Sequence, residues 1–319
     1  MKKFDLAIIG AGPIGLFSAS FAHLHGLETI VFDSLSEAGG QPKLLYPFKK
    51  IFDIPVFNQI TGAELIEKLM YSAERKAKFV FDHRVNSIEK IEDYFLIDKE
   101  FEVKSVIIAT GNGSFTPKAF PLHTNDEIEK RIQYFINDPQ KFQNQTIGIF
   151  GGGDSALDWA LELANAANTQ IKIIHRRNEF RGLEANVQQL KKLQNVEVLT
   201  PYLPKAVTLS NNQLEIELKE IGTTNIIAKK FDQIVVAYGF RSDNNFVSKW
   251  GVNLTKGQIG VSRAMETNIS GIYAVGDAAY YPERVPVIGL GFGEAQIAIT
   301  SIMRSLFPKK NLTIHSTSI

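Results

Sequence analysis

The chain has 319 residues, of which 44% are hydrophobic and 22% charged, with a formal net charge of +1 and no cysteine. The lack of cysteine excludes disulfides, thiolate metal sites and a catalytic thiol or dithiol relay, and we expect no metal centre. The balanced charge argues against a nucleic-acid-binding or disordered protein, and no apolar stretch approaches the ~20 residues of a membrane helix. Because the N-terminus runs into a strand pattern without a cleavage-site signature, we expect a cytoplasmic protein with no signal peptide.

The N-terminal segment reads as a strand, a glycine-rich turn, a helix and a second strand. An apolar run over 6–9 precedes the turn Gly10-Ala11-Gly12-Pro13-Ile14-Gly15. An amphipathic stretch follows over 16–25, and a second apolar run covers 29–32. This order predicts a βαβ unit whose two strands are parallel.

The same strand–turn–helix–strand pattern occurs a second time in the middle of the chain. A strand pattern over 146–150 leads into the turn 151–156, a helical stretch over 157–166 and a strand over 171–174. The buried-strand runs 106–111 and 234–239 each close one unit, and a third section adds a strand over 271–275 and a helix over 293–306. The length also predicts two domains.

The simplest topology inserts the second unit into the first. We therefore predict an α/β fold of two Rossmann-like, three-layer dinucleotide-binding domains. Residues 1–116 and 242–319 form a discontinuous domain, with a C-terminal tail over 307–319, and residues 117–241 form the inserted domain.

The first glycine turn has the residues that dinucleotide binding needs. Gly10 allows a tight turn, Gly12 lets the backbone approach a pyrophosphate, and Gly15 lets helix and strand pack closely at a helix N-terminus that favours anions. Asp33 ends the second strand, where a carboxylate accepts hydrogen bonds from a ribose hydroxyl. The alternative is a solvated acid at the end of a strand, and the context favours adenosine binding.

The second copy differs where the two nicotinamide cofactors are told apart. Instead of an acid, the second strand is followed by His175-Arg176-Arg177, with Arg181 shortly after. A carboxylate repels a 2′-phosphate, whereas guanidinium groups bind one through paired hydrogen bonds. A solvated basic cluster is the alternative, and the position behind a second dinucleotide motif favours NADPH over NADH.

Two dinucleotide sites in one chain indicate a tightly held flavin and an exchangeable nicotinamide cofactor. Gly276-Asp277 follows a strand, so its carboxylate is placed to accept a hydrogen bond from a ribityl chain or to cap a turn. The residues alone leave these two roles of Asp277 open.

The ordered motifs resemble the thioredoxin-reductase branch of the two-dinucleotide flavoproteins over essentially the whole chain. The motifs that carry this resemblance are Gly10–Gly15, Gly39-Gly40-Gln41, Ala109-Thr110-Gly111, Gly151–Ala156, His175-Arg176-Arg177 and Gly276-Asp277. Thioredoxin reductases carry a Cys-x-x-Cys shortly before the second glycine motif, where this chain reads Tyr134-Phe135-Ile136-Asn137-Asp138. The chain is therefore similar to the thioredoxin-reductase-type ferredoxin–NADP⁺ reductases of bacteria, which the segment Leu44–Pro47 and the tail His315-Ser316-Thr317-Ser318 also resemble.

The resemblance implies a non-covalent FAD in the discontinuous domain and NADP(H) in the inserted one. The implied FAD residues are Gly10, Gly12, Pro13, Gly15, Asp33, Gly40, Gln41, Tyr46, Val85, Ala109, Gly111, Phe115, Asp277 and Ser318. The implied NADP residues are Gly152, Gly153, Asp154, Ser155, Ala156, His175, Arg176, Arg177, Arg181, Tyr238 and Gly239.

The resemblance also implies two candidates for stacking or gating at the flavin ring. Tyr46 would stack on one face, and His315, with Ser316 beside it, would cover the other face from the same or a neighbouring subunit. Without the resemblance, Tyr46 reads as a half-buried core tyrosine and the tail as an inert chain end.

The function that these features imply is ferredoxin–NADP⁺ reductase. Such an enzyme transfers hydride between NADP(H) and FAD and exchanges single electrons with ferredoxin or flavodoxin, here as an expected homodimer. One alternative is an NADPH-dependent diaphorase or quinone reductase with a small-molecule acceptor. A flavin-binding sensor without turnover is the other.

Overall fold

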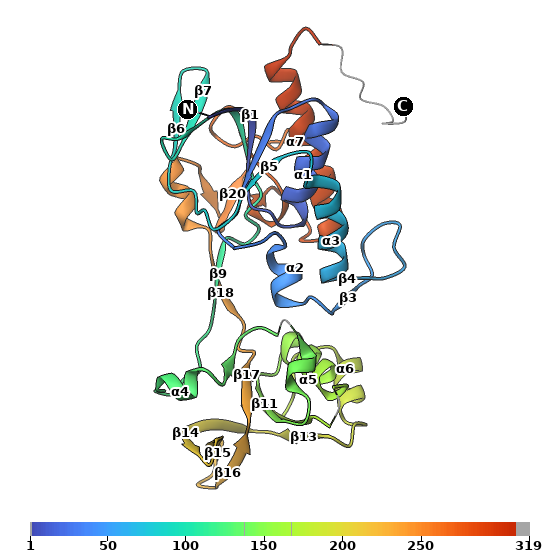
Figure 1. The fold of residues 1–319 in the computed structure, drawn as a ribbon, viewed down its shortest axis with the longest axis vertical. Coiled ribbons are helices and arrows are strands. Elements are labelled where there is room, and N and C mark those ends of the chain that lie inside the picture. The colour runs from blue at the N-terminus through green and yellow to red at the C-terminus, as the bar shows by residue number, and fades with distance from the viewer. Residues whose placement is uncertain (1, 137, 167, 311–319) are drawn as a thin grey trace. The chain divides into compact units, whose positions relative to one another are not determined.

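A computed structural model describes residues 2–136, 138–166 and 168–310. The chain divides into two compact units, which are Met1–Phe115 with Ser242–Ile319 and Thr116–Arg241. The second unit is therefore inserted into the sequence of the first (Figure 1). Strands β9 (Ser114–Pro117) and β18 (Phe240–Asp243) pair where the chain passes from one unit to the other.

The first unit is built on a seven-stranded sheet. Its strand order is β5-β2-β1-β8-β7-β6, and β21 pairs with β8 outside this path. The bounds are β1 Lys2–Ile9, β2 Thr29–Phe32, β5 Lys78–Val80, β6 Ile88–Ile91, β7 Tyr94–Ile97, β8 Phe101–Ile108 and β21 Ile272–Ala274. The strands β5, β2, β1, β8 and β21 are parallel, whereas β6 and β7 add an antiparallel hairpin that we did not predict.

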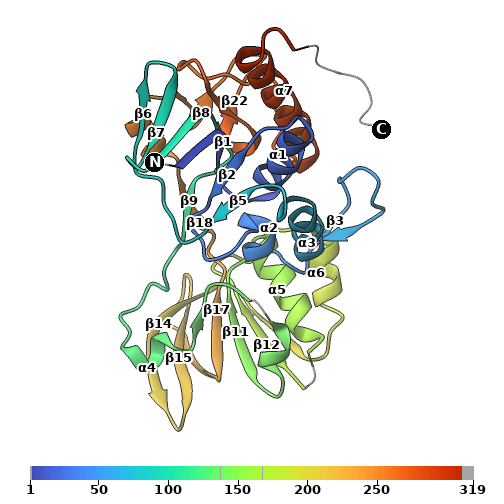
Figure 2. The ribbon, with the colours of Figure 1, turned by 45° about the horizontal axis from the view of Figure 1, so that its top comes forward.

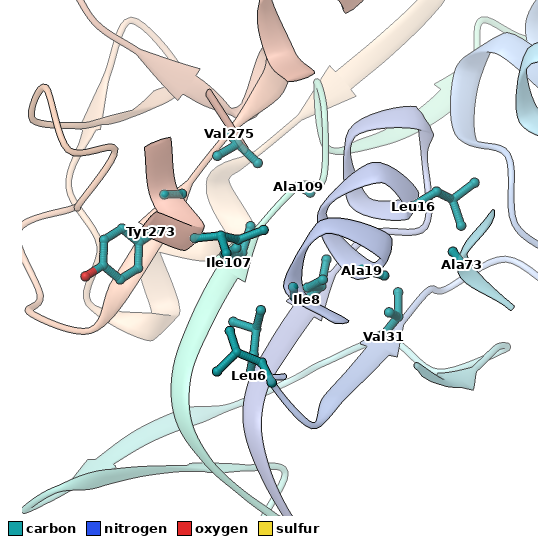
Figure 3. Packing of buried hydrophobic residues seen from close by; sticks show 14 of the residues in the cluster. Leu6, Ile8, Leu16, Ala19, Val31, Ala73, Ile107, Ala109, Tyr273 and Val275 are labelled. Atoms are coloured by element: carbon teal, nitrogen blue, oxygen red, sulfur yellow. The ribbon is translucent and has the colours of Figure 1, made fainter. Parts of the chain in front are cut away.

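Both faces of this sheet are buried, because alternate residues of β1 enter two separate clusters. Leu6 and Ile8 pack under α1 (Pro13–Leu24), α3 (Gly62–Ala73) and α7 (Ile288–Leu306), which lie side by side in Figure 1. Ala7 and Ile9 face η2 (Asn245–Trp250) and the small sheet of β19 (Leu254–Thr255), β20 (Gln258–Gly260) and β22 (Ala279–Tyr280). Figure 3 shows the first cluster, with side chains from β1, β2, β8 and α1 meeting in one apolar layer. The unit therefore has three layers, as its βαβ pattern predicts.

The inserted unit is built on a five-stranded parallel sheet of order β10-β17-β11-β12-β13. The bounds are β10 Ile132–Gln133, β11 Thr146–Phe150, β12 Gln170–Ile174, β13 Val196–Leu199 and β17 Gln233–Val236. Helices α5 (Asp154–Ala164) and α6 (Glu184–Leu190) pack beside each other (Figure 2). An antiparallel sheet of β14 (Tyr202–Ser210), β15 (Gln213–Glu220) and β16 (Ile226–Phe231) buries Leu214, Ile216 and Leu218 against Phe150 and Ile174.

The remaining elements are short. They are α2 (Gly40–Leu45), β3 (Lys50–Ile51), β4 (Ile60–Thr61), α4 (Asp126–Glu129), η1 (Pro139–Phe142) and η3 (Gly276–Ala278). Among the helices that the structure describes, none combines the length and the apolar character that crossing a bilayer requires.

Three helices begin earlier than the sequence pattern predicts, and one of them, α5, starts at Asp154 rather than Leu157. Helix α1 starts at Pro13 rather than Leu16, because proline at the first position has the right φ and gives up only an N–H that would be unpaired. Helix α7 starts at Ile288 rather than Gly293. Its glycines allow close packing instead of ending the helix, since a Cβ at Gly291 would lie 2.5 Å from the Ile14 side chain.

Candidate functional site

The first glycine turn joins β1 to α1 and needs glycine at two positions for steric reasons. Gly10 has a φ of +108°, and a Cβ there would lie 2.4 Å from the Ala109 carbonyl oxygen. A Cβ at Gly15 would lie 1.8 Å from the Gly10 carbonyl oxygen. Gly12 differs, because no described atom lies within 4 Å of where its Cβ would be.

Gly12 also caps α1, and no side chain bonds to the first turn of that helix among the described residues. Pro13 follows as the first helical residue. An uncapped helix N-terminus that begins at a glycine without close neighbours is an arrangement that binds phosphate groups. The residues present fit the pyrophosphate of a dinucleotide.

Asp33 lies at the end of β2 and is tied to the same turn. One carboxylate oxygen accepts the Ala11 N–H at 2.6 Å and the other accepts the Leu35 N–H at 2.9 Å. Burial raises the pKa of Asp33, and hydrogen bonds from the backbone N–H groups of Leu35, Ala11 and Ser34 oppose this shift. The observed role of Asp33 is thus to fix the turn, and its contact with a ribose stays a prediction.

The Gly39-Gly40-Gln41 segment closes on the same turn. The Gly39 N–H donates to the Ala11 carbonyl at 3.0 Å. Gly40 has a φ of +56°, and its Cβ would lie 3.2 Å from the Gly12 Cα. Gln41 follows as the second residue of α2.

Tyr46 and Asp277, which are far apart in sequence, are brought together. Burial, followed by the nearby carboxylates of Asp277 and Asp53, raises the pKa of the Tyr46 phenol to about 12. The Asn112 amide points to an Asp277 carboxylate oxygen at 3.4 Å, so the segment after β8 reaches the same place. Gly111 has a φ of +61°, and its carbonyl accepts from the Asn244 amide at 3.3 Å. The ends of β1, β8 and β21 therefore converge on one region, as expected at the carboxyl edge of a parallel sheet.

The other predicted FAD residues are less directly placed. Ala109 packs against Gly10, and the Val85 side chain is buried in the core cluster that contains Ala7 and Ile9. The Phe115 side chain and the residues His315, Ser316 and Ser318 lie outside the described part of the chain.

The second glycine turn joins β11 to α5 and repeats this design. A Cβ at Gly151 would lie 2.5 Å from the Ala237 carbonyl oxygen, and one at Gly152 would lie 2.3 Å from the Nδ1 atom of His175. Gly153 caps α5, and no described atom lies within 4 Å of its missing Cβ. Ala156 is buried in the helix below.

His175 and three arginines lie beside this second turn. The His175 ring is 6% exposed, stacks on Phe180 with centroids 5.7 Å apart, and its Nε2 atom has no hydrogen-bond partner among the described residues. Burial lowers the pKa of His175, and the positive charges of Arg181, Arg176 and Arg177 lower it further. The Arg181 N–H donates to the Gly152 carbonyl at 2.7 Å, which ties this segment to the turn.

The guanidinium groups of Arg176, Arg177 and Arg181 are available to an anion. All three residues are exposed, and no ion pair within the described ranges involves them. A buried nitrogen without a partner and several unpaired cations beside an open helix N-terminus fit the phosphates of NADP(H).

The remaining predicted NADP residues surround the same turn. The Asp154 carboxylate accepts the Leu183 N–H at 3.0 Å, which connects the start of α5 to the loop before α6. Ser155 is exposed at the first turn of α5. Burial raises the pKa of Tyr238, which the nearby Arg176 opposes, and Gly239 follows with a φ of +85°.

Comparison with known proteins identifies the family. The family model for pyridine nucleotide-disulphide oxidoreductases matches residues 4–298. The chain belongs to this family. It is 61% identical over 312 residues to a ferredoxin–NADP reductase of Lactobacillus helveticus, and the alignment covers 98% of this chain and 100% of that one. It is 60% identical over 306 residues to a ferredoxin–NADP reductase of Lactobacillus acidophilus, and that alignment covers 96% of this chain and 98% of the relative. Among solved structures, a Lactococcus lactis thioredoxin reductase in its FR conformation superposes with a TM-score of 0.75 at 28% identity, covering 94% of this chain and 98% of that one.

These findings confirm the predicted family and the α/β fold of two Rossmann-like domains. They also confirm that the chain is an oxidoreductase. This family member has no cysteine, so its own side chains provide no dithiol for disulfide chemistry.

Sequence reasoning missed the buried groups that hold Asp277. Arg284 and Glu294 contact the Gly276-Asp277 turn, and their side chains are only 5% and 1% exposed. The signal was present, because Glu294 lies within the glycine-rich and otherwise apolar first half of α7.

Proposed function

We propose that this chain is an FAD-containing ferredoxin–NADP reductase. The observation that carries the proposal is the pair of open glycine turns with opposite chemistry behind them. A carboxylate follows the first βαβ unit's second strand, and the second unit has at that place three arginines that form no ion pair with any residue the structure describes, in a chain without cysteine. The names of its relatives at 60–61% identity support the same activity.

In this proposal FAD lies along the first unit. Gly12 and Pro13 would hold its pyrophosphate, and Asp33 would bind the adenosine ribose with the lone pairs that the Ala11 and Leu35 N–H groups leave unused. Gln41, Tyr46 and Asp277 surround the opposite end of the cofactor. The remaining FAD contacts are Gly10, Gly15, Gly40, Val85, Ala109, Gly111, Phe115 and Ser318.

NADP(H) lies on the second unit. Gly152 and Gly153 would hold its pyrophosphate, and Arg176 and Arg177 would bind its 2′-phosphate. Asp154, Ser155, Ala156, His175, Arg181, Tyr238 and Gly239 complete this site. The exposure and the missing ion pairs of the arginines support the choice of NADPH over NADH.

The residues of the first unit would hold FAD, and this cofactor would supply an exchange between two-electron hydride transfer and single-electron transfer, which suits an iron–sulfur or flavodoxin partner. The chain's own residues hold and orient the two cofactors, and none needs to act as an acid or base in hydride transfer. Tyr46 supplies an apolar face for the flavin ring, and the high pKa of its phenol keeps this face uncharged. The resemblance offers His315 and Ser316, of the same or a neighbouring subunit, as candidates for the other face of the ring, and both lie outside the described residues. Because NADPH and ferredoxin occur in the cytoplasm, we place the enzyme there.

The test begins with what the purified protein carries. Heat release followed by chromatography should yield FAD, and NADPH should bleach the bound flavin anaerobically. Ferredoxin from the same organism should then increase NADPH-dependent cytochrome c reduction, whereas thioredoxin should not be reduced. Fast dye or quinone reduction with no response to ferredoxin or flavodoxin would favour the small-molecule alternative, and failure of NADPH to bleach the flavin would favour the sensor.

A further inference from the structure

A buried charge network lies directly behind the Gly276-Asp277 turn. The Glu294 carboxylate, on α7, accepts the Gly276 N–H at 2.7 Å and the Tyr281 O–H at 2.8 Å. It also accepts the Arg284 Nε–H at 2.8 Å and the Arg284 Nη2–H at 3.4 Å. The two carboxylate oxygens have about four acceptor positions, so the described residues fill all of them.

Arg284 links this carboxylate to Asp277. Its third nitrogen, Nη1, lies 3.2 Å from the Asp277 carboxylate, and the Arg284 side chain is 5% exposed. Asp277 keeps 35% of its side-chain surface exposed. Arg284 therefore holds one oxygen of the Asp277 carboxylate from inside the protein, while the other oxygen has only the long 3.4 Å contact with the Asn112 amide among the described residues, and the side chain keeps surface for a ligand.

The backbone beneath Asp277 is fixed by the same network. Gly276 has a φ of +67°, and a Cβ there would lie 3.1 Å from Ile14 of α1. Helix α7 packs beside α1 (Figure 1), which carries Ile14 and begins at the first glycine turn. Glu294 thus ties the turn to α7, while Gly276 itself lies against α1.

We infer that Arg284 and Glu294 are positioning residues that present Asp277 to FAD. The inference rests on the proposed function, because it takes FAD as the ligand of Asp277. A bidentate guanidinium fixes both the place and the direction of the group it bridges, which a single ammonium does not. Neither residue touches the cofactor in this assignment, and both act through Asp277 and the Gly276 N–H.

The test measures how tightly the holoenzyme keeps FAD. The dissociation constant follows from a dilution series, in which free FAD is detected by its fluorescence. R284M removes the bridge to Asp277 and leaves Glu294 as an unpaired buried charge, so this variant risks misfolding. The double variant R284M/E294Q removes both charges, and the amide oxygen of the introduced glutamine can still accept the Gly276 N–H. It is therefore expected to melt near the wild-type temperature.

We expect the FAD dissociation constant to rise at least tenfold in R284M/E294Q and in any folded R284M. The FAD dissociation constant of R284K should lie between those of these variants and the wild type, since a lysine ammonium can replace only some of the hydrogen bonds of the guanidinium group. The matched control is K104M, which breaks the exposed 2.8 Å pair of Lys104 with Asp5 in the same unit and should leave the constant unchanged.

The outcomes separate the inference from the proposed function. Wild-type protein that carries no FAD contradicts the proposed function. The inference is overturned if the wild-type protein carries FAD and the FAD dissociation constants of all folded variants lie within twofold of the wild-type value. The same holds if R284M lowers only the melting temperature, since that result assigns the pair a structural role alone.

Discussion

Replacing Arg176 and Arg177 with glutamine should remove the preference for NADPH over NADH. Both side chains are exposed just beyond the end of β12, and no ion pair in the described part of the chain occupies them. A 2′-phosphate carries a charge of about −2, and each charge-assisted hydrogen bond to it contributes about 1.5–3 kcal/mol. Because the arginines are solvent-exposed, the lower value applies, and losing two contacts costs about 3 kcal/mol.

This free energy sets the expected size of the effect. At about 1.4 kcal/mol per factor of ten, kcat/KM for NADPH should fall about 100-fold. NADH has no 2′-phosphate, so its kcat/KM should change by less than about threefold, and its contacts with Gly152 and Gly153 are untouched. Added salt should reduce the NADPH advantage of the wild type, because it screens exposed charges.

The assay is steady-state turnover with each nucleotide and ferricyanide as the acceptor, which makes the result independent of the protein partner. The control K191Q/K192Q removes the same charge from two exposed lysines of the inserted unit. An equal loss with NADH and NADPH would refute the assignment of the arginines. So would a similar loss in the control, because the effect would then come from net charge alone.

Three further predictions follow from the geometry. G15A places a Cβ 1.8 Å from the Gly10 carbonyl oxygen and should lower the unfolding free energy by about 3 kcal/mol. In G12A the new Cβ has no described atom within 4 Å, so the loss should be about 1 kcal/mol or less. G12A should nevertheless weaken FAD binding about tenfold, and an unchanged affinity would contradict the pyrophosphate assignment. His175 has a folded-state pKa below its ordinary 6.5, so the unfolded chain binds the proton first and the stability of the inserted unit should fall as the pH drops below 6.5. H175Q should show a smaller loss in denaturant titrations between pH 7.5 and 5.5, chosen as roughly one unit either side of the ordinary histidine pKa, and identical pH slopes would disprove this. Val56 is fully exposed with a φ of +77°, a backbone conformation that glycine adopts without strain, so V56G should raise the unfolding free energy by about 0.5–1 kcal/mol. The control V285G, at an exposed valine without positive φ, should lower it. A lower unfolding free energy in V56G would show that Val56 is not strained.

The parts of the fold that the sequence predicts are those that local rules dictate. Strands β1 and β11 are apolar runs that end in glycine turns, and the helices after them begin where the turns release the backbone. Gly10 and Gly15 could be assigned roles because a Cβ at either position meets backbone of the same βαβ unit or of its neighbouring strand. The family and its motifs then extend this assignment to the second turn.

The antiparallel sheet of β14, β15 and β16 shows what a search for glycine motifs overlooks. The segment 213–220 alternates apolar and polar residues, and Leu214, Ile216 and Leu218 are fully buried. This period of two predicts a strand with one buried face. The signal was therefore local and readable, but it carries no chemistry and so drew no prediction.

The role of Asp33 and the network behind Asp277 could not be read in this way. A carboxylate at a strand end reads as a ligand for ribose, but its observed bond to the Ala11 N–H depends on how closely β2 approaches the turn after β1. Likewise, a glutamate in an apolar helix predicts a buried polar contact without saying which one. Its partners, Arg284 and the Gly276 N–H, lie 10 and 18 residues away along the chain and meet it where α7 packs against η3. Residues that contact a cofactor can be found from sequence motifs, whereas the residues that position them depend on tertiary packing. Substitutions in this second group should therefore alter cofactor binding although they lie away from the cofactor.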